Sequence, residues 1–315
     1  MENATTAEKF MNFTMSLDDD DTISLMPYWT AFSKMAGLPK PNMENPAATT
    51  KFKNFLMSLD NDDIACFSTL FNWINLSRMD GLPETFFRKA ADYVDWRFIS
   101  QFQTLSEALI REFADRVDWE YISEFQTLSE EFIREFADRL EWQHISATQK
   151  LSHAFIREFA DRVQWTLISE YQTLSAEFIR EFADSVEWSG ISICQKLSEA
   201  SIREFADRVY WIYICIDQTL SEAFIREFAD RVEWNYVSEH QTLSEAFIRE
   251  FADRVEWEHI CEHQTLSFSF IRQHLSYVHF NRQIRETIAR GHAAQHFTLN
   301  TFLPEELNRS IMSYF

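Results

Sequence analysis

A stretch of 23 residues recurs along this chain, and it constrains the fold more than any other feature. One clean copy, residues 220–242, reads LSEAFIREFADRVEWNYVSEHQT, and the next copy begins at Leu243. Eight tryptophans keep the same 23-residue spacing: Trp96, Trp119, Trp142, Trp165, Trp188, Trp211, Trp234 and Trp257. A fixed period of this length is typical of repeat arrays, in which each unit packs on its neighbours.

Each repeat is predicted to form two short helices. Counting positions 1 to 23 from the leucine, one apolar set stands at positions 1, 5, 6 and 9, a spacing that lies on one helix face. A second set stands at positions 13, 15 and 18. Thr127 with Glu130, and Asp138 with Glu141, fit the capping-box spacing, so we expect Thr127 and Asp138 to be N-caps. We therefore expect helices over roughly positions 1–10 and 12–22.

Helices of about ten residues are marginal in isolation. Each must bury its apolar face, and the adjacent repeats are the neighbours at hand. The sequence therefore predicts an all-α fold, an α-solenoid of short αα-hairpin repeats. Three regions are expected: a helical N-terminal region over 1–81, the tandem repeats over 82–288, and a C-terminal capping helix within 289–315. Residues 10–18 resemble residues 52–60, which indicates a duplication within the N-terminal region.

Composition narrows the class of function. The formal net charge is −21, and an acidic surface repels phosphate, so nucleic acid is not expected as a partner. No apolar run reaches the roughly 18 residues of a membrane span, and no signal peptide opens the sequence, so we expect an intracellular protein that is not secreted. Cys215 and Cys261 stand at position 19, where most copies have serine, which favours free thiols in a reducing setting.

The copies differ most at positions 16, 17, 20 and 21 of the predicted second helix. Positions 17 and 21 are four residues apart and share one helix face. Aromatic residues are frequent anchors for protein partners. The alternative interpretation is a tolerant surface that has drifted. The candidate partner-binding residues on this face are Phe98, Phe102, Tyr121, Phe125, Tyr171, Tyr213, Tyr236 and His240.

Metal binding and catalysis are not favoured by the sequence. His259 and His263 have a four-residue spacing that zinc sites use, but no nearby carboxylate at ligand spacing completes a set unambiguously. Residues 60–63 are acidic but lack the turn glycine and the bidentate glutamate of a calcium loop. No glycine-rich phosphate loop occurs, and the Ser–His and Glu–Glu pairings belong to the repeat or to its variable positions. We expect no enzyme activity, no cofactor and no resident metal, with a metal module at His259 and His263 kept as an alternative.

The pattern W-x-x-I-S-x-x-Q-x-L-S-x-x-F-I-R is complete over residues 119–134 and 165–180. It resembles the short, uncharacterised tandem repeats in proteins of large double-stranded DNA viruses and some phages, over residues 82–288. The resemblance implies a viral protein of the host cytoplasm or the virion, and it carries no site residues. The favoured hypothesis is a non-enzymatic scaffold that binds other proteins, such as capsid or other virion proteins. The alternative is a structural strut that self-associates.

Overall fold

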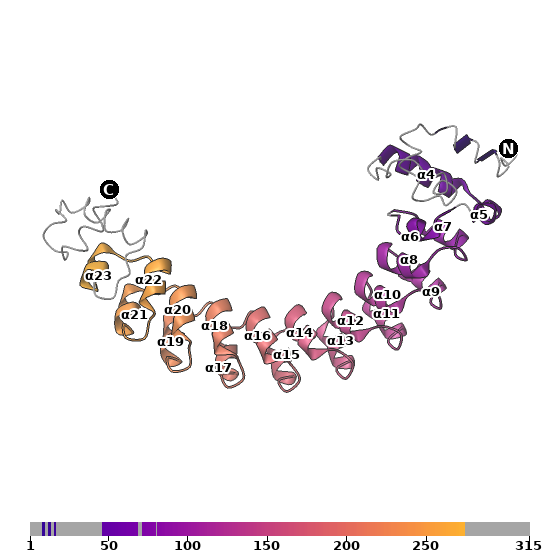
Figure 1. The fold of residues 1–315 in the computed structure, drawn as a ribbon. Coiled ribbons are helices and arrows are strands. Elements are labelled where there is room, and N and C mark those ends of the chain that lie inside the picture. The colour runs from indigo at the N-terminus through magenta and orange to yellow at the C-terminus, as the bar shows by residue number, and fades with distance from the viewer. Residues whose placement is uncertain are drawn as a thin grey trace, which may run out of the picture. The chain divides into compact units, whose positions relative to one another are not determined.

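The computed structural model describes residues 8–9, 12–13, 16, 46–68, 71–79 and 81–274, and this part of the chain is all-helical (Figure 1). The predicted fold class is confirmed, because helix pairs repeat regularly and pack in sequence order as an α-solenoid of helical hairpins. The chain divides into two compact units, Met1–Gln164 and Trp165–Phe315. The predicted capping helix and the first copy of the N-terminal duplication lie almost wholly outside the described residues.

Over the described residues from 46 to 79 the first unit has three helices, and the repeats follow. Its helices are α4 (Pro46–Ser58), α5 (Asn61–Phe67), α6 (Trp73–Ser77), α7 (Glu84–Lys89), α8 (Trp96–Phe102), α9 (Glu107–Glu112), α10 (Trp119–Phe125), α11 (Glu130–Glu135), α12 (Trp142–Thr148) and α13 (His153–Glu158).

The second unit consists of repeats in its described part. Its helices are α14 (Trp165–Tyr171), α15 (Ala176–Glu181), α16 (Trp188–Cys194), α17 (Glu199–Glu204), α18 (Trp211–Asp217), α19 (Glu222–Glu227), α20 (Trp234–His240), α21 (Glu245–Glu250), α22 (Trp257–His263) and α23 (Phe268–Gln273). No helix in the described part of the chain has the length and apolar character of a membrane span.

The acidic residues 60–63 are used as a helix cap. Asp60 is the N-cap of α5, where its Oδ1 accepts a hydrogen bond from Asp63 N at 2.9 Å and Asp63 Oδ2 accepts one from Asp60 N at 2.9 Å. Lys9 Nζ donates to both carboxylates, at 2.9 and 2.5 Å. This pairing gives both aspartates a structural role in starting the helix.

The helices of each repeat are shorter than predicted, and the predicted N-caps are wrong. The first helix covers positions 3–8 and the second covers positions 15–21. Ser129, not Thr127, caps the first helix, since its hydroxyl accepts from Phe132 N at 3.2 Å. Asp138 lies in the turn between the helices and Glu141 stands at the N-cap of α12. The capping-box spacing gave the wrong N-cap for the first helix because the glutamate at position 3 pairs with the following repeat. Glu107 Oε1 accepts a hydrogen bond from the backbone N–H of Ser129 in the next repeat, at 2.7 Å.

The core lies between the two helices of each repeat and between neighbouring repeats. Phe132, Ile133 and Ile145 are fully buried and represent positions 5, 6 and 18. The tryptophan at position 15 joins one repeat to the next. Trp119 is half-buried, and its ring lies 6.3 Å from the Phe132 ring and 4.9 Å from the Phe136 ring of the following repeat.

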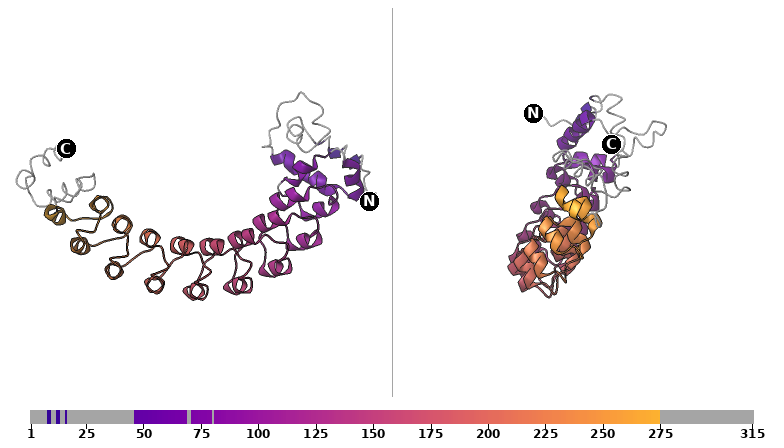
Figure 2. Two further views of the ribbon diagram at one scale, coloured as in Figure 1. Left: turned by 60° about the horizontal axis from the view of Figure 1, so that its bottom comes forward. Right: turned by 90° about the vertical axis from the view of Figure 1, so that its left-hand side faces the viewer.

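The second helices pack against one another within each unit. The pairs in contact are α6–α8, α8–α10 and α10–α12 in the first unit, and α14–α16, α16–α18, α18–α20 and α20–α22 in the second. Figure 2 shows these helices in one row within each unit and the first helices in another. Because positions 18, 19 and 22 are buried in this packing, positions 16, 17, 20 and 21 form the outward face of each second helix.

A ladder of buried glutamines at position 22 connects the repeats. Gln126 Nε2 donates to Ser100 O at 3.0 Å and to Gln103 O at 2.8 Å, and its Oε1 accepts from Leu105 N at 2.9 Å. The amide thus pairs three backbone groups that the short connections would leave unpaired. The buried members of the ladder are Gln103, Gln126, Gln149, Gln172, Gln195, Gln218, Gln241 and Gln264.

Candidate functional site

The outward face of the second helices carries the residues predicted from the sequence. Rings at positions 17 and 21 lie together in α8, α10 and α20, with centroid distances of 6.1, 6.0 and 6.3 Å. The exposed members are Phe102 (45%), Phe125 (50%), Tyr171 (62%) and His240. The half-buried members are Phe98, Tyr121, Tyr213 and Tyr236. Four of the eight candidates lie in the first unit and four in the second, so they form two separate sets.

Position 17 is half-buried because its side chain leans on the preceding second helix. Arg97 Nη2 donates to Tyr121 Oη at 2.9 Å, and its Cζ lies 5.4 Å from the Tyr121 ring centroid. The glycine at this position in α16 shows how close the helices are: a Cβ on Gly190 would lie 3.1 Å from Glu170 Cγ. Residues at position 17 therefore contribute to packing, while those at position 21 are freer to contact a partner.

A second set of exposed apolar residues, on α16 and α18, was missed by the sequence analysis. Ile193 is 41% exposed, Tyr210 50% and Ile212 44%. They occupy positions 20, 14 and 16. At positions 14 and 16 the other Trp-containing copies have polar residues, and at position 20 they have polar residues except for Ala147 and Ile216. The Tyr210 ring lies 6.2 Å from that of Tyr213. A comparison of hydropathy between the copies at positions 14, 16 and 20 could have identified this set. Positions 17 and 21 do not include it.

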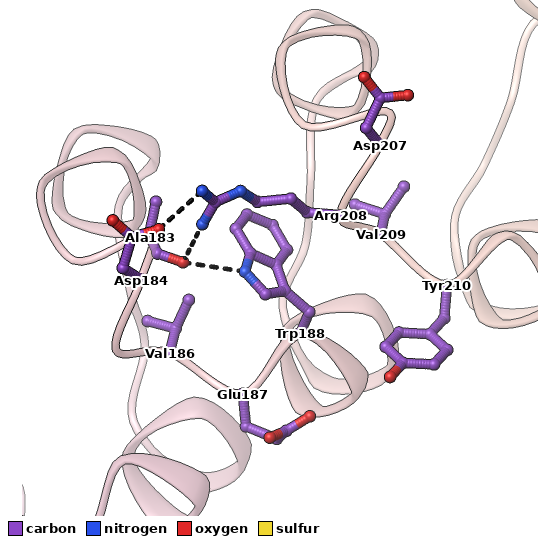
Figure 3. Close-up of a pocket in the computed structure, with 9 residues that line it drawn as sticks. All are labelled: Ala183, Asp184, Val186, Glu187, Trp188, Asp207, Arg208, Val209 and Tyr210. Atoms are coloured by element: carbon purple, nitrogen blue, oxygen red, sulfur yellow. Dashed lines mark hydrogen bonds and ion pairs between the residues drawn. The ribbon is translucent and has the colours of Figure 1, made fainter.

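A groove of about 590 Å³ lies between two successive turns of the second unit (Figure 3). Arg208 lies along it, donating to Ala183 O at 2.5 Å and pairing with Asp184 Oδ1 at 2.6 Å. Trp188 Nε1 donates to the same carbonyl at 2.9 Å. The residues that line the groove are Ala183, Asp184, Val186, Glu187, Trp188, Asp207, Arg208, Val209 and Tyr210.

This groove belongs to the repeat architecture. A smaller one of about 370 Å³ occupies the equivalent place in the first unit, where Ala114, Trp119 and Arg139 are among its lining residues. Arg139 Nη1 donates to Ala114 O at 2.7 Å and Nη2 to Asp115 Oδ1 at 2.9 Å, as Arg208 does in its own groove. The arginines are therefore held by the preceding repeat, and neither groove brings a nucleophile and a histidine base together.

The charges of the first helices form inter-repeat ion pairs. Arg88, Arg111 and Arg134 each donate through Nε to the glutamate at position 8 of the following repeat, at 2.7 to 2.8 Å. The hydrogen bond that Arg111 donates to the Glu135 carboxylate raises the pKa of Arg111 above its ordinary value. Exposed pairs of this kind contribute little individually, but these pairs link the first helices of successive repeats.

These features define a helical-repeat protein of the α-solenoid class, with a repeated core and a surface that varies between copies. No protein-family model, curated protein or solved structure matches the chain.

Proposed function

We propose that this protein is a non-enzymatic scaffold that binds another protein through the outward face of its second helices. The observation that carries the proposal is the contrast between copies. Core positions repeat, whereas positions on the outward face become aromatic or aliphatic while remaining exposed to solvent.

The strongest local departure is on α16 and α18. Ile193 and Ile212 stand at positions 20 and 16, where the other copies have polar residues or alanine, except for Ile216 at position 20. Ile212 and Ile216 are four residues apart and share one helix face with Tyr213. Exposed aliphatic and aromatic side chains grouped on one face are typical of protein-binding surfaces.

The class of partner rests on the resemblance of the repeat to those of large DNA viruses. On that basis we propose capsid or other virion proteins as partners, and the host cytoplasm or the virion as the setting. The acidic net charge of −21 favours a partner with a basic surface.

The test is capture of partners by the full-length chain, compared with variants that use residues found at the same position in other copies. Ile193→Glu combined with Ile212→Glu removes the exposed aliphatic residues, and position 20 is Glu170 and position 16 is Glu120 elsewhere. Tyr210→Glu is the matched control, because Tyr210 is also exposed but stands at position 14, outside the outward face, and lines the groove. We expect the double variant to lose the partner and the control to keep it, with the helical circular dichroism signal unchanged in both.

Two results would contradict this assignment. Undiminished capture by the double variant would remove α16 and α18 from the binding surface. Loss of capture by Tyr210→Glu alone would assign binding to the groove.

Self-association is the second candidate, since exposed apolar residues such as Ile212 could equally contact another copy of the chain. Light scattering distinguishes the two. A mass that rises with protein concentration, and falls back to that of a monomer in the double variant, would favour the strut over the scaffold.

A further inference from the structure

Three potential metal ligands meet at the junction between α20 and α22 in the second unit. Glu239 comes from position 20 of one repeat, and His259 and His263 come from positions 17 and 21 of the next. One ligand atom of each lies within 4.8 Å of those of the other two. The two imidazole rings lie 6.0 Å apart on α22. The sequence alone could not supply Glu239, because the pairing depends on which helices are neighbours.

We propose that Glu239, His259 and His263 bind one divalent transition-metal ion, and that the ion is Zn²⁺. Two imidazole nitrogens and one carboxylate oxygen are ligands that zinc takes in proteins. Zinc bonds of about 2.0–2.2 Å place such ligand atoms roughly 3–4 Å apart, so separations of no more than 4.8 Å require at most a small movement of the three side chains. Glu239 is half-buried and His263 is exposed, which leaves both room to rotate.

The polar environment of the junction supports a cation. Among the described residues, His259 Nδ1 is buried and has no hydrogen-bond partner. A buried polar atom without a partner is unfavourable, and a metal ion bound to that nitrogen would supply one. The neighbouring charged groups are compatible, because Glu262 Oε2 lies 3.9 Å from His263 Nε2 and His240 Nε2 lies 3.6 Å from Glu239 Oε2.

The two other junctions compared below do not have this set of three ligands. At the preceding junction of the same unit the corresponding residues are Ile216, Tyr236 and His240, which offer one ligand. In the first unit the junction of α10 and α12 has Glu124, His144 and Thr148, which offer two imidazole or carboxylate ligands. Within the described residues, Glu239, His259 and His263 are the group that brings three such ligands together.

A bound ion would connect one repeat to the next. It would stabilise the packing of α22 against α20, in addition to the contacts that the two helices already make. Three protein ligands also leave one position of a tetrahedral site for water or for a ligand from outside the chain.

The experiment is a calorimetric titration of Zn²⁺ into the full-length chain, purified without a histidine tag and stripped with a chelator. The variants use residues from other copies at the same positions: Glu239→Gln (as Gln101), His259→Tyr (as Tyr121) and His263→Phe (as Phe125). The wild-type chain should bind one equivalent more than any of the three variants, or bind it at least about 100-fold more tightly, since even outer-shell changes cost 10–100-fold. His153→Glu (as Glu130) is the control, because it removes a histidine on α13 in the first unit, and it should bind as the wild type does.

Two results would overturn the proposal. Titration curves that are the same in the wild type and in all three variants would mean that no zinc binds at this junction. The second result is that the histidine variants lose binding while Glu239→Gln binds fully. Zinc would then bind only to the histidine pair on α22, and not to a site across the junction.

Discussion

At the scale of single residues, the glutamine at position 22 connects successive repeats through hydrogen bonds to their backbone. Gln126 is buried, yet both ends of its amide are paired with backbone groups of the neighbouring connection. A side chain is needed there because the connections between such short helices have no regular backbone partners. The repeat motif contains this glutamine, but only the packing of successive repeats shows which groups it pairs.

The first prediction concerns this ladder. Gln126→Leu keeps the side-chain volume similar but leaves Ser100 O, Gln103 O and Leu105 N without their partner. Each unpaired buried group costs about 1–3 kcal/mol, so the free energy of unfolding should fall by about 3 kcal/mol or more. Urea denaturation measures it. A loss below about 1 kcal/mol, within the range of an ordinary single hydrogen bond, would mean that water replaces the amide.

The second prediction separates the two candidate caps of the first helix. Ser129→Ala removes the hydroxyl that accepts from Phe132 N and should lower the free energy of unfolding by about 1 kcal/mol. Thr127→Ala changes an exposed residue outside the helix and should have an effect within about 0.5 kcal/mol. Equal losses in the two variants would restore Thr127 as a cap.

At the scale of the helices, position 19 shows how the second helices are joined. Ser123 Oγ donates to Trp119 O at 2.6 Å and accepts from Glu141 N of the next repeat at 2.9 Å. Cys215 takes this place in α18, where Glu233 N–H donates to the sulfur and burial raises the pKa of the Cys215 thiol to about 11. The cysteine is therefore a neutral, buried replacement for the serine.

The third prediction follows from this thiol. An unfolded cysteine has a pKa of about 8.5, so between that pH and about pH 11 the folded chain binds more protons than the unfolded chain does. The free energy of unfolding should fall as pH rises through this window, by up to about 3 kcal/mol. Cys215→Ser restores the usual residue and should remove that part of the loss. Parallel stability curves for wild type and variant from pH 8 to 11 would contradict the assignment.

The fourth prediction tests the geometry of the junctions. If positions 20, 17 and 21 converge at every junction, Thr148→His should complete a ligand set with Glu124 and His144 in the first unit. The variant should bind one more equivalent of Zn²⁺ than the wild-type chain in equilibrium dialysis. An unchanged stoichiometry would mean that the junction of α20 and α22 has a geometry of its own.

At the scale of the whole molecule, the 23-residue period was enough to predict the all-α solenoid and the outward direction of residues such as Phe102 and Phe125. Period and apolar spacing determine which helix face is buried, so this part follows from sequence. The helix ends did not follow from the sequence. Thr127 and Asp138 have capping-box spacing, but Ser129 and Glu141 stand at the N-caps of these helices. The meeting of Glu239 with His259 depends on the neighbour relation between repeats and needed the structure.

Binding of a partner by the outward face is tested most directly by hydroxyl-radical footprinting of the full-length chain, alone and with its captured partner. We expect modification of Ile193 and Ile212 to fall several-fold in the complex, while Tyr210, which is also exposed but lines the groove, is modified as before. Protection of Tyr210 with Ile193 and Ile212 unchanged, or protection confined to the first helices such as α15 and α17, would contradict binding by the outward face of the second helices.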